Sequence, residues 1–276
     1  GTRLSADAPN PANRPKLESQ ESKRTVMKGV PMRTAKAMDA SLTMPTATTV
    51  RSVPMKLVID QRTVINNFLK RSKGGKVSFT HIIGFAMVQA LKAIPGMNNA
   101  YGEENGKPVL IENSSINLGL AMDLVKADGS RTLVVPAIKG CEQLNFAQWL
   151  AAYEEVVKKG RNGTLTVDDF AGVTASLTNP GGLGTNHSVP RLMNGQGVIL
   201  GVGSIDYPPE FQGTSESRIN EMGISKITTL TSTYDHRVIQ GAQSGEFLRT
   251  MHQLLLGANG FYDQIFEALR IPYPPL

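Results

Sequence analysis

One stretch near the C-terminus constrains the fold most, because it joins a strand pattern to a helix pattern through a charged triplet. The β-branched run 227–234 predicts a strand that ends at Asp235-His236-Arg237. Gly241 and Gly245 then begin a stretch whose apolar residues recur at helical spacing. A histidine between a carboxylate and a guanidinium at such a connection can be held in one orientation. His236 is therefore the first candidate for chemistry.

Strand and helix patterns along the chain come in separate runs. Strands are predicted at 46–59, 108–112, 115–123, 132–139, 172–177, 198–205 and 226–234. Helices are predicted at 27–41, 60–71 with Asp60 as its cap, 79–94, 145–159, 242–256 and 261–269. The polar loop 126–131 is predicted to connect a hairpin. Strands in runs, with helices segregated from them, predict an α+β domain.

Composition bounds the class of protein. The single cysteine, Cys141, excludes an internal disulfide framework and a site of several thiolates, and it favours a reducing interior. No apolar run approaches about 18 residues and no secretory pattern is present, so we expect a cytoplasmic protein without a membrane partner. The net charge of +6 is modest, and no nucleic-acid recognition motif accompanies it. The proline-rich and polar ends predict linkers at 1–25 and 271–276 around a domain at 26–270.

The candidate chemical groups are few. Of the four histidines, His81 and His252 lie on predicted helices and are assigned structural roles, whereas His187 follows a glycine-rich loop. No Gly-x-Ser-x-Gly elbow supplies a hydrolase nucleophile, and no spacing of ligands predicts a metal site. This combination suits a reaction whose nucleophile arrives with the substrate.

The glycine-rich loop at 178–184 has two interpretations. Its glycines could cradle a phosphate, although the loop matches neither the dinucleotide fingerprint nor the P-loop. Alternatively, the loop is a tight turn that presents the hydroxyl of Thr178 and lets another backbone segment pass close by. The plain turn is the favoured interpretation.

Several motifs together resemble one known family. The stretch 234–241 is similar to the Asp-His-Arg-x-x-Asp-Gly signature of the dihydrolipoamide acyltransferases of 2-oxo acid dehydrogenase complexes. Further similar segments follow in order along residues 26–270, at 38–41, 95–99, 133–138, 159–161 and 175–181. The closest likeness is to the acyltransferase domain of actinobacterial 2-oxoglutarate dehydrogenases, where it is fused to a thiamine-dependent decarboxylase.

This resemblance implies a fold and a reaction. The expected fold is a chloramphenicol-acetyltransferase-like α+β domain with a mixed central sheet, helices segregated to one side and a trimeric assembly. The expected reaction is succinyl transfer between dihydrolipoamide and coenzyme A, at a site between subunits and without a metal. Expected partners are the decarboxylase, the lipoyl domain of another acyltransferase and dihydrolipoamide dehydrogenase.

The resemblance also assigns roles to residues. His236 is the expected base and Thr178 the expected donor to the oxyanion, while Asp235 and Arg237 support the loop. Thr185, His187 and Arg191 are candidates to bind a substrate carboxylate.

One position departs from the family pattern. Gln240 stands where the family has an aspartate linked to a buried arginine, and Pro31 stands where many relatives have an arginine. We interpret this paired change as an altered support for the site. The alternatives are a degenerate domain that serves only as a trimeric core, or an acetyl rather than a succinyl transferase.

Overall fold

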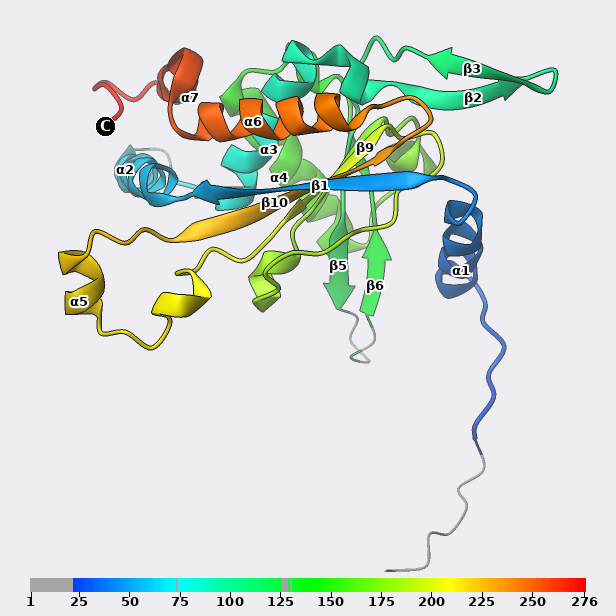
Figure 1. The fold of residues 1–276 in the computed structure, drawn as a ribbon, viewed down its shortest axis with the longest axis horizontal. Coiled ribbons are helices and arrows are strands. Elements are labelled where there is room, and N and C mark those ends of the chain that lie inside the picture. The colour runs from blue at the N-terminus through cyan, green and yellow to red at the C-terminus, as the bar shows by residue number, and fades with distance from the viewer. Residues whose placement is uncertain (1–21, 73, 126–128, 130) are drawn as a thin grey trace, which may run out of the picture.

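A six-stranded mixed sheet organises the fold of the computed structural model, which describes residues 22–72, 74–125, 129 and 131–276 (Figure 1). Its order is β1-β10-β9-β8-β4-β7, with parallel pairing only between β9 and β8 and between β8 and β4. The bounds are β1 (Thr46–Pro54), β4 (Leu118–Leu120), β7 (Ala137–Ile138), β8 (Ala175–Thr178), β9 (Val198–Val202) and β10 (Ile227–Asp235). The expected α+β class with a mixed central sheet is confirmed.

Most helices gather in one layer on one side of this sheet (Figure 1). The helices are α1 (Val30–Ser41), α2 (Lys56–Ser72), α3 (Phe79–Ala93), α4 (Phe146–Asn162), α5 (Glu216–Glu221), α6 (Gly241–Leu255) and α7 (Phe261–Leu269). Only α1 and the short α5 lie apart from that layer. The expected segregation of helices is therefore confirmed for the five that contribute most of the helical core.

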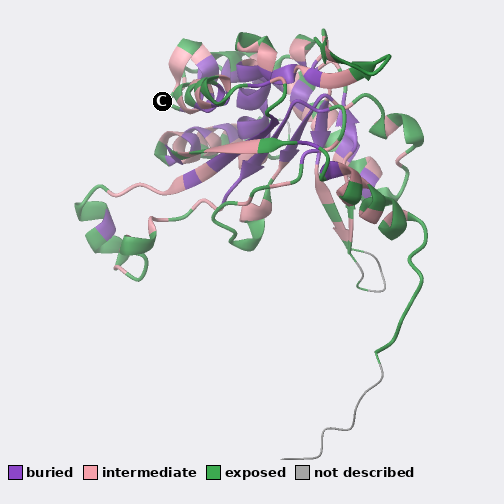
Figure 2. Ribbon diagram, turned by 45° about the vertical axis from the view of Figure 1, so that its right-hand side comes forward, coloured by how far each residue is buried: buried purple, intermediate pink, exposed green. Residues whose placement is uncertain are grey.

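The core lies between the sheet and α3, which is buried along nearly its whole length (Figure 2). Large aromatic side chains from four helices fill it, namely Phe85, Phe146, Trp149, Phe247 and Phe261. A Cβ at Gly84 would lie 2.8 Å from the Trp149 ring, so only glycine lets α4 pack this closely on α3. The tight packing fixes the N-terminal end of α3, which contacts the loop after β8.

The opposite face of β10 is polar but still buried. Thr231 and Thr233 are at most 1% exposed. The Thr231 hydroxyl donates to the Ser188 carbonyl at 2.9 Å, and the hydroxyls of Thr233 and Thr48 lie 2.8 Å apart. The segment 185–197 therefore returns across this face of the sheet, from the end of β8 to the beginning of β9.

Two hairpins project from the domain. The first joins β2 (Ala100–Glu104) and β3 (Lys107–Ile111) through Asn105 and Gly106, both with positive φ. The second joins β5 (Met122–Val125) and β6 (Arg131–Val134). The predicted hairpin at 126–131 is confirmed by the antiparallel pairing of β5 with β6, although 126–128 and 130 lie outside the described residues.

Several predicted boundaries are wrong. The helix predicted to begin at Asp60 begins at Lys56, and the strand predicted to reach 59 ends at Pro54. Proline lacks the N–H that a strand ladder needs, and it is tolerated here because β1 is an edge strand. The predicted strands 115–123 and 132–139 are each divided in two, and β2 and α5 were not predicted.

The ends of the chain behave differently. The predicted N-terminal linker falls mostly on residues 1–21, which lie outside the described residues. At the other end, the Gln61 amide, wholly buried on α2, donates to the Leu276 carbonyl at 2.9 Å and accepts from the Leu276 N–H at 3.2 Å. Tyr273 lies edge-on to Phe68 and Phe266. The segment 271–276, predicted as a linker, therefore packs on α2. None of the described helices has the length and apolar character needed to span a membrane.

Candidate active site

His236 lies one residue beyond the end of β10, and its backbone and ring are both anchored. Its N–H donates to the Pro45 carbonyl at 3.0 Å, which ties it to the segment before β1. Its ring Nδ1 lies 3.1 Å from the carbonyl oxygen of Ile239. A carbonyl can only accept, so Nδ1 carries the proton and the neutral ring presents the lone pair of Nε2. The side chain is exposed, and the geometry therefore offers Nε2 as a base.

Asp235 and Arg237 hold the turn that carries His236. The Asp235 carboxylate is 2% exposed and accepts from Nη2 of Arg237 at 2.7 Å and from its Nε at 2.9 Å. It also accepts from the Arg237 backbone N–H at 3.1 Å. The hydrogen bond to Asp235 raises the pKa of the Arg237 guanidinium. Asp235 and Arg237, two of the three residues predicted to support the site, thus contact each other.

Gln240 occupies the N-cap position of α6 and is exposed. Its backbone N–H donates to Oε1 of Gln243 at 2.8 Å, which satisfies one amide at the helix start. Pro31 lies in the first turn of α1, where the missing N–H of proline is tolerated.

Thr178 is the last residue of β8 and is half-buried. The next residue, Asn179, donates from its side chain to the Thr80 hydroxyl at 2.7 Å and accepts from the Gly181 N–H at 3.1 Å. These bonds hold the turn after Thr178 against the beginning of α3. A Cβ on Gly181 would lie 2.3 Å from the Gly203 carbonyl, so the interpretation of a turn with a close backbone passage is confirmed.

Within one chain, His236 and Thr178 lie at opposite ends of the sheet. Thr178 is level with Gly201, which is level with Thr231, and His236 follows Thr231 by five positions. Standard strand dimensions give about 17 Å along the strands and about 10 Å across them, or roughly 20 Å in all. A single chain therefore cannot bring these two side chains to one reacting carbon.

The three candidates for carboxylate binding are exposed and divide between the same two ends. Thr185 lies beside the end of β9, where its carbonyl accepts from the Ser204 N–H at 2.8 Å. His187 lies two positions further along the segment 185–197, which crosses this face of the sheet. Arg191 lies near α1, where its Nε donates to the Ser41 hydroxyl at 3.1 Å. Thr185 and His187 thus lie toward the Thr178 end and Arg191 toward the His236 end.

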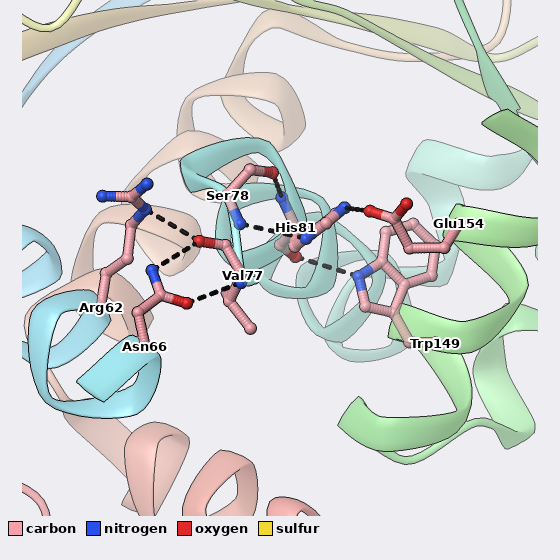
Figure 3. Close-up of polar contacts among 7 residues, drawn as sticks. All are labelled: Arg62, Asn66, Val77, Ser78, His81, Trp149 and Glu154. Carbon is pink, nitrogen blue, oxygen red and sulfur yellow. Dashed lines mark hydrogen bonds and ion pairs between the residues drawn. The ribbon is translucent and has the colours of Figure 1, made fainter. Parts of the chain in front are cut away.

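Other candidate groups have structural roles. His81 is 2% exposed and caps α3, while His252 accepts from Nε of Arg51 at 2.9 Å (Figure 3 for His81). Among the described residues, no group of three His, Cys, Asp or Glu side chains could hold a metal ion.

Sequence reasoning missed Tyr101, whose ring lies 3.7 Å from the Arg237 guanidinium. The Asn105-Gly106 pair is a strong hairpin signal that could have located its strand.

Solved structures with the same fold include acyltransferase cores. The cubic core of a pyruvate dehydrogenase multienzyme complex aligns with a TM-score of 0.73 at 24% identity, covering 91% of this chain and 95% of that one. The dihydrolipoamide acetyltransferase of Azotobacter vinelandii aligns with a TM-score of 0.72 at 24% identity, covering 90% and 94%. At this identity, the likeness establishes the fold.

Similar sequences establish more. The 2-oxoglutarate dehydrogenase E1/E2 component of Corynebacterium glutamicum is 58% identical over 262 residues, which is 95% of this chain. The multifunctional 2-oxoglutarate metabolism enzyme of Mycolicibacterium vanbaalenii is 57% identical over 94% of this chain. The chain spans 21% of the length of each relative. The family model of the 2-oxoacid dehydrogenases acyltransferase catalytic domain matches residues 19–261. The chain therefore belongs to the 2-oxoacid dehydrogenases acyltransferase (catalytic domain) family.

Proposed function

We propose that this domain transfers a succinyl group from dihydrolipoamide to coenzyme A within a 2-oxoglutarate dehydrogenase complex. Membership of the acyltransferase family supports the reaction class. The names of the two relatives, both concerned with 2-oxoglutarate, support succinyl over acetyl as the acyl group. The observation that carries the proposal is the hydrogen bond from Nδ1 of His236 to the Ile239 carbonyl, because it leaves Nε2 as an acceptor on the exposed side of the ring.

His236 acts as the base in this mechanism. A thiol with a pKa of about 8.5 holds little thiolate at neutral pH, so attack on the thioester needs a proton acceptor. Nε2 removes the proton from the coenzyme A thiol, and the coenzyme A sulfur forms a bond to the thioester carbon of the succinyl group. When the intermediate collapses, the bond to the dihydrolipoamide sulfur breaks and the imidazolium returns the proton to that sulfur. Atoms and charges balance without a metal or a redox step.

Thr178 stabilises the oxyanion of the tetrahedral intermediate. Its hydroxyl is a donor at the end of a strand that Asn179 and Gly181 hold in place. Because the two residues lie roughly 20 Å apart within one chain, the His236 of one copy meets the Thr178 of another. A trimer supplies three such sites by symmetry, with each copy contributing both of its sheet ends.

The same arrangement assigns the candidates for carboxylate binding. Arg191 comes to the site with the His236 of its own copy, and its Nε bond to Ser41 leaves the guanidinium Nη groups for the succinyl carboxylate. Thr185 and His187 come with Thr178 from the neighbouring copy. A site built for succinate would lose affinity for acetyl donors, which cannot satisfy Arg191.

The proposed partners follow from the proposed transfer reaction. A lipoyl domain of another acyltransferase delivers the succinyl group. Dihydrolipoamide dehydrogenase then reoxidises the dihydrolipoamide that remains on that domain. The thiamine-dependent decarboxylase lies on the same polypeptide, as the greater length of the relatives suggests. A cytoplasmic location stays a prediction. The alternative of a degenerate structural core gains no support from Gln240, which is exposed and has a place at the start of α6.

A mixing experiment tests the shared site and the reaction together. His236→Ala and Thr178→Ala should each lose about two orders of magnitude or more in transfer between succinyl-coenzyme A and dihydrolipoamide. Dissociated and reassembled together, the two variants should recover about a quarter of the wild-type sites, because each restored site needs one intact residue from each copy. Mixtures that stay inactive, although mixed trimers are seen by mass spectrometry, would contradict the shared site. A wild-type domain without any transfer would contradict the proposed function.

A further inference from the structure

The ring of Tyr101 lies against the guanidinium that supports His236. Tyr101 belongs to β2, which is not part of the six-stranded sheet, and the Arg237 guanidinium carbon lies 3.7 Å from the Tyr101 ring centroid. Along its N–H edge, the Arg237 guanidinium donates two short hydrogen bonds to the Asp235 carboxylate. The guanidinium is thereby held both by an aromatic face and by a buried carboxylate, a combination that favours a cation.

A continuous set of bonds joins this stack to the His236 ring. The Asp235 carbonyl accepts from the backbone N–H of Val238 at 3.2 Å and of Ile239 at 2.9 Å, which closes a tight turn around His236. The Ile239 carbonyl in turn accepts from Nδ1 of His236. The side chain of Ile239 is wholly buried, so the acceptor is held rigidly. Any rotation of Asp235 would therefore move the carbonyl that selects the tautomer of His236.

The base of the hairpin is also anchored, so Tyr101 is a fixed support. The side chain of Asn98 donates to the Ser115 carbonyl at 3.0 Å, and the side chain of Asn113 donates to the Asn98 carbonyl at 2.8 Å. Tyr101 follows Asn98 by three positions, and its strand pairs along its length with β3. The Tyr101 ring thus comes from the β2–β3 hairpin, whereas His236 follows a strand of the six-stranded sheet.

We propose that Tyr101 is a positioning residue for the acyl transfer, acting through Arg237 and Asp235 to hold the His236 ring with its proton on Nδ1. This inference rests on the proposed function and extends it to the β2–β3 hairpin. Loss of the Tyr101 ring leaves one face of the guanidinium open to water, which loosens the turn and lets the second imidazole tautomer form.

Three variants test this role in the intact domain. Tyr101→Leu removes the aromatic face and should lower kcat about five- to tenfold, with the KM for coenzyme A unchanged. Tyr101→Phe keeps the face and should restore kcat to within about twofold of wild type. Ile111→Ala, on the other face of the same hairpin, is the matched control and should leave kcat unchanged. Equal losses in Tyr101→Leu and Ile111→Ala would overturn the proposal, as would equal losses in Tyr101→Leu and Tyr101→Phe.

Coupling between the two residues gives a second measurement. In an Arg237→Gln background, Tyr101→Leu should have no further effect on kcat, because the stack is already absent. Fully additive losses would show that Tyr101 acts by another route and would overturn the proposal.

A third measurement is independent of turnover. Nitrogen-15 NMR of labelled histidine should show His236 mainly protonated at Nδ1 in the wild type and as a mixture of tautomers in Tyr101→Leu. An unchanged tautomer in Tyr101→Leu would refute the positioning role even if the domain proved inactive. Absence of transfer in the wild type would contradict only the proposed reaction.

Discussion

His81 and His236 show how the same side chain is used in opposite ways in two regions of one domain. At His81, the ring Nδ1 accepts from the Ser78 N–H at 3.1 Å, and Nε2 lies 3.1 Å from the Glu154 carboxylate (Figure 3). At His236, Nδ1 donates to a carbonyl instead. The two rings therefore carry their protons on opposite nitrogens.

Burial explains the difference in outcome. His81 is 2% exposed, and burial, with the nearby Arg62 guanidinium, lowers its pKa to about 4. Both of its nitrogens are occupied by protein groups, so the ring serves as a cap for α3. His236 is exposed, and among the described residues its ring has a hydrogen bond recorded at Nδ1 and none at Nε2. The comparison teaches that a histidine suited to catalysis has one nitrogen fixed by the protein and the other directed outward.

The largest effect is expected from His236→Ala. Removing the proposed base should reduce succinyl transfer by about two to four orders of magnitude, with the trimer intact and the free energy of unfolding little changed. Steady-state kinetics and sedimentation would check this together. Unchanged turnover would remove His236 from the mechanism, and the contrast with His81 would lose its functional meaning.

Thr178→Ala should have the next largest effect, a loss of about two to three orders of magnitude in kcat, because the proposed oxyanion donor disappears. Thr178→Ser keeps the hydroxyl and is the matched control, expected to retain most of the activity. Measuring kcat and KM separately is informative, since the hydrogen bond acts in the transition state. If the alanine and serine variants were equally active, the oxyanion would need another donor.

Acid should weaken the folded domain through His81. Its pKa is lowered from 6.5 to about 4, so below pH 6.5 the unfolded chain binds a proton that the folded chain refuses. The free energy of unfolding should therefore fall by about 3 kcal/mol between pH 6.5 and 4 from this residue alone. Urea unfolding between pH 6.5 and 4 should show that the free energy of unfolding depends less on pH in His81→Gln than in the wild type. His187→Gln, at an exposed position, is the control. A slope unchanged in His81→Gln would mean that other groups dominate.

The sequence predicts α3 closely because its signals are local. Ser78 caps the helix and Pro95 follows its end, and both act within a few residues of the boundary. The beginning of α2 is predicted wrongly because the β-branched residues Val58 and Ile59 favour a strand. In the structure both residues lie in α2 and pack against the core. Local pattern and tertiary packing favour different structures there, and packing decides.

The sequence proposes residues for the candidate site but does not predict its geometry. His236 and Thr178 stand out through strand ends and motif likeness. Their separation within one chain follows from the register of β8, β9 and β10, which no local pattern specifies. The contact between Tyr101 and Arg237 joins elements more than a hundred residues apart. Such long-range contacts depend on the whole fold.

The docked segment 271–276 has a practical consequence for where the domain should be cut. The family match ends at residue 261, yet Phe261, Ile265 and Phe266 of α7 belong to the core. Truncation after Leu269 would keep these side chains but strip both hydrogen bonds from the amide of Gln61, which is wholly buried. An unpaired buried polar group costs about 1–3 kcal/mol. Recombinant versions of this domain should therefore extend at least to Leu276.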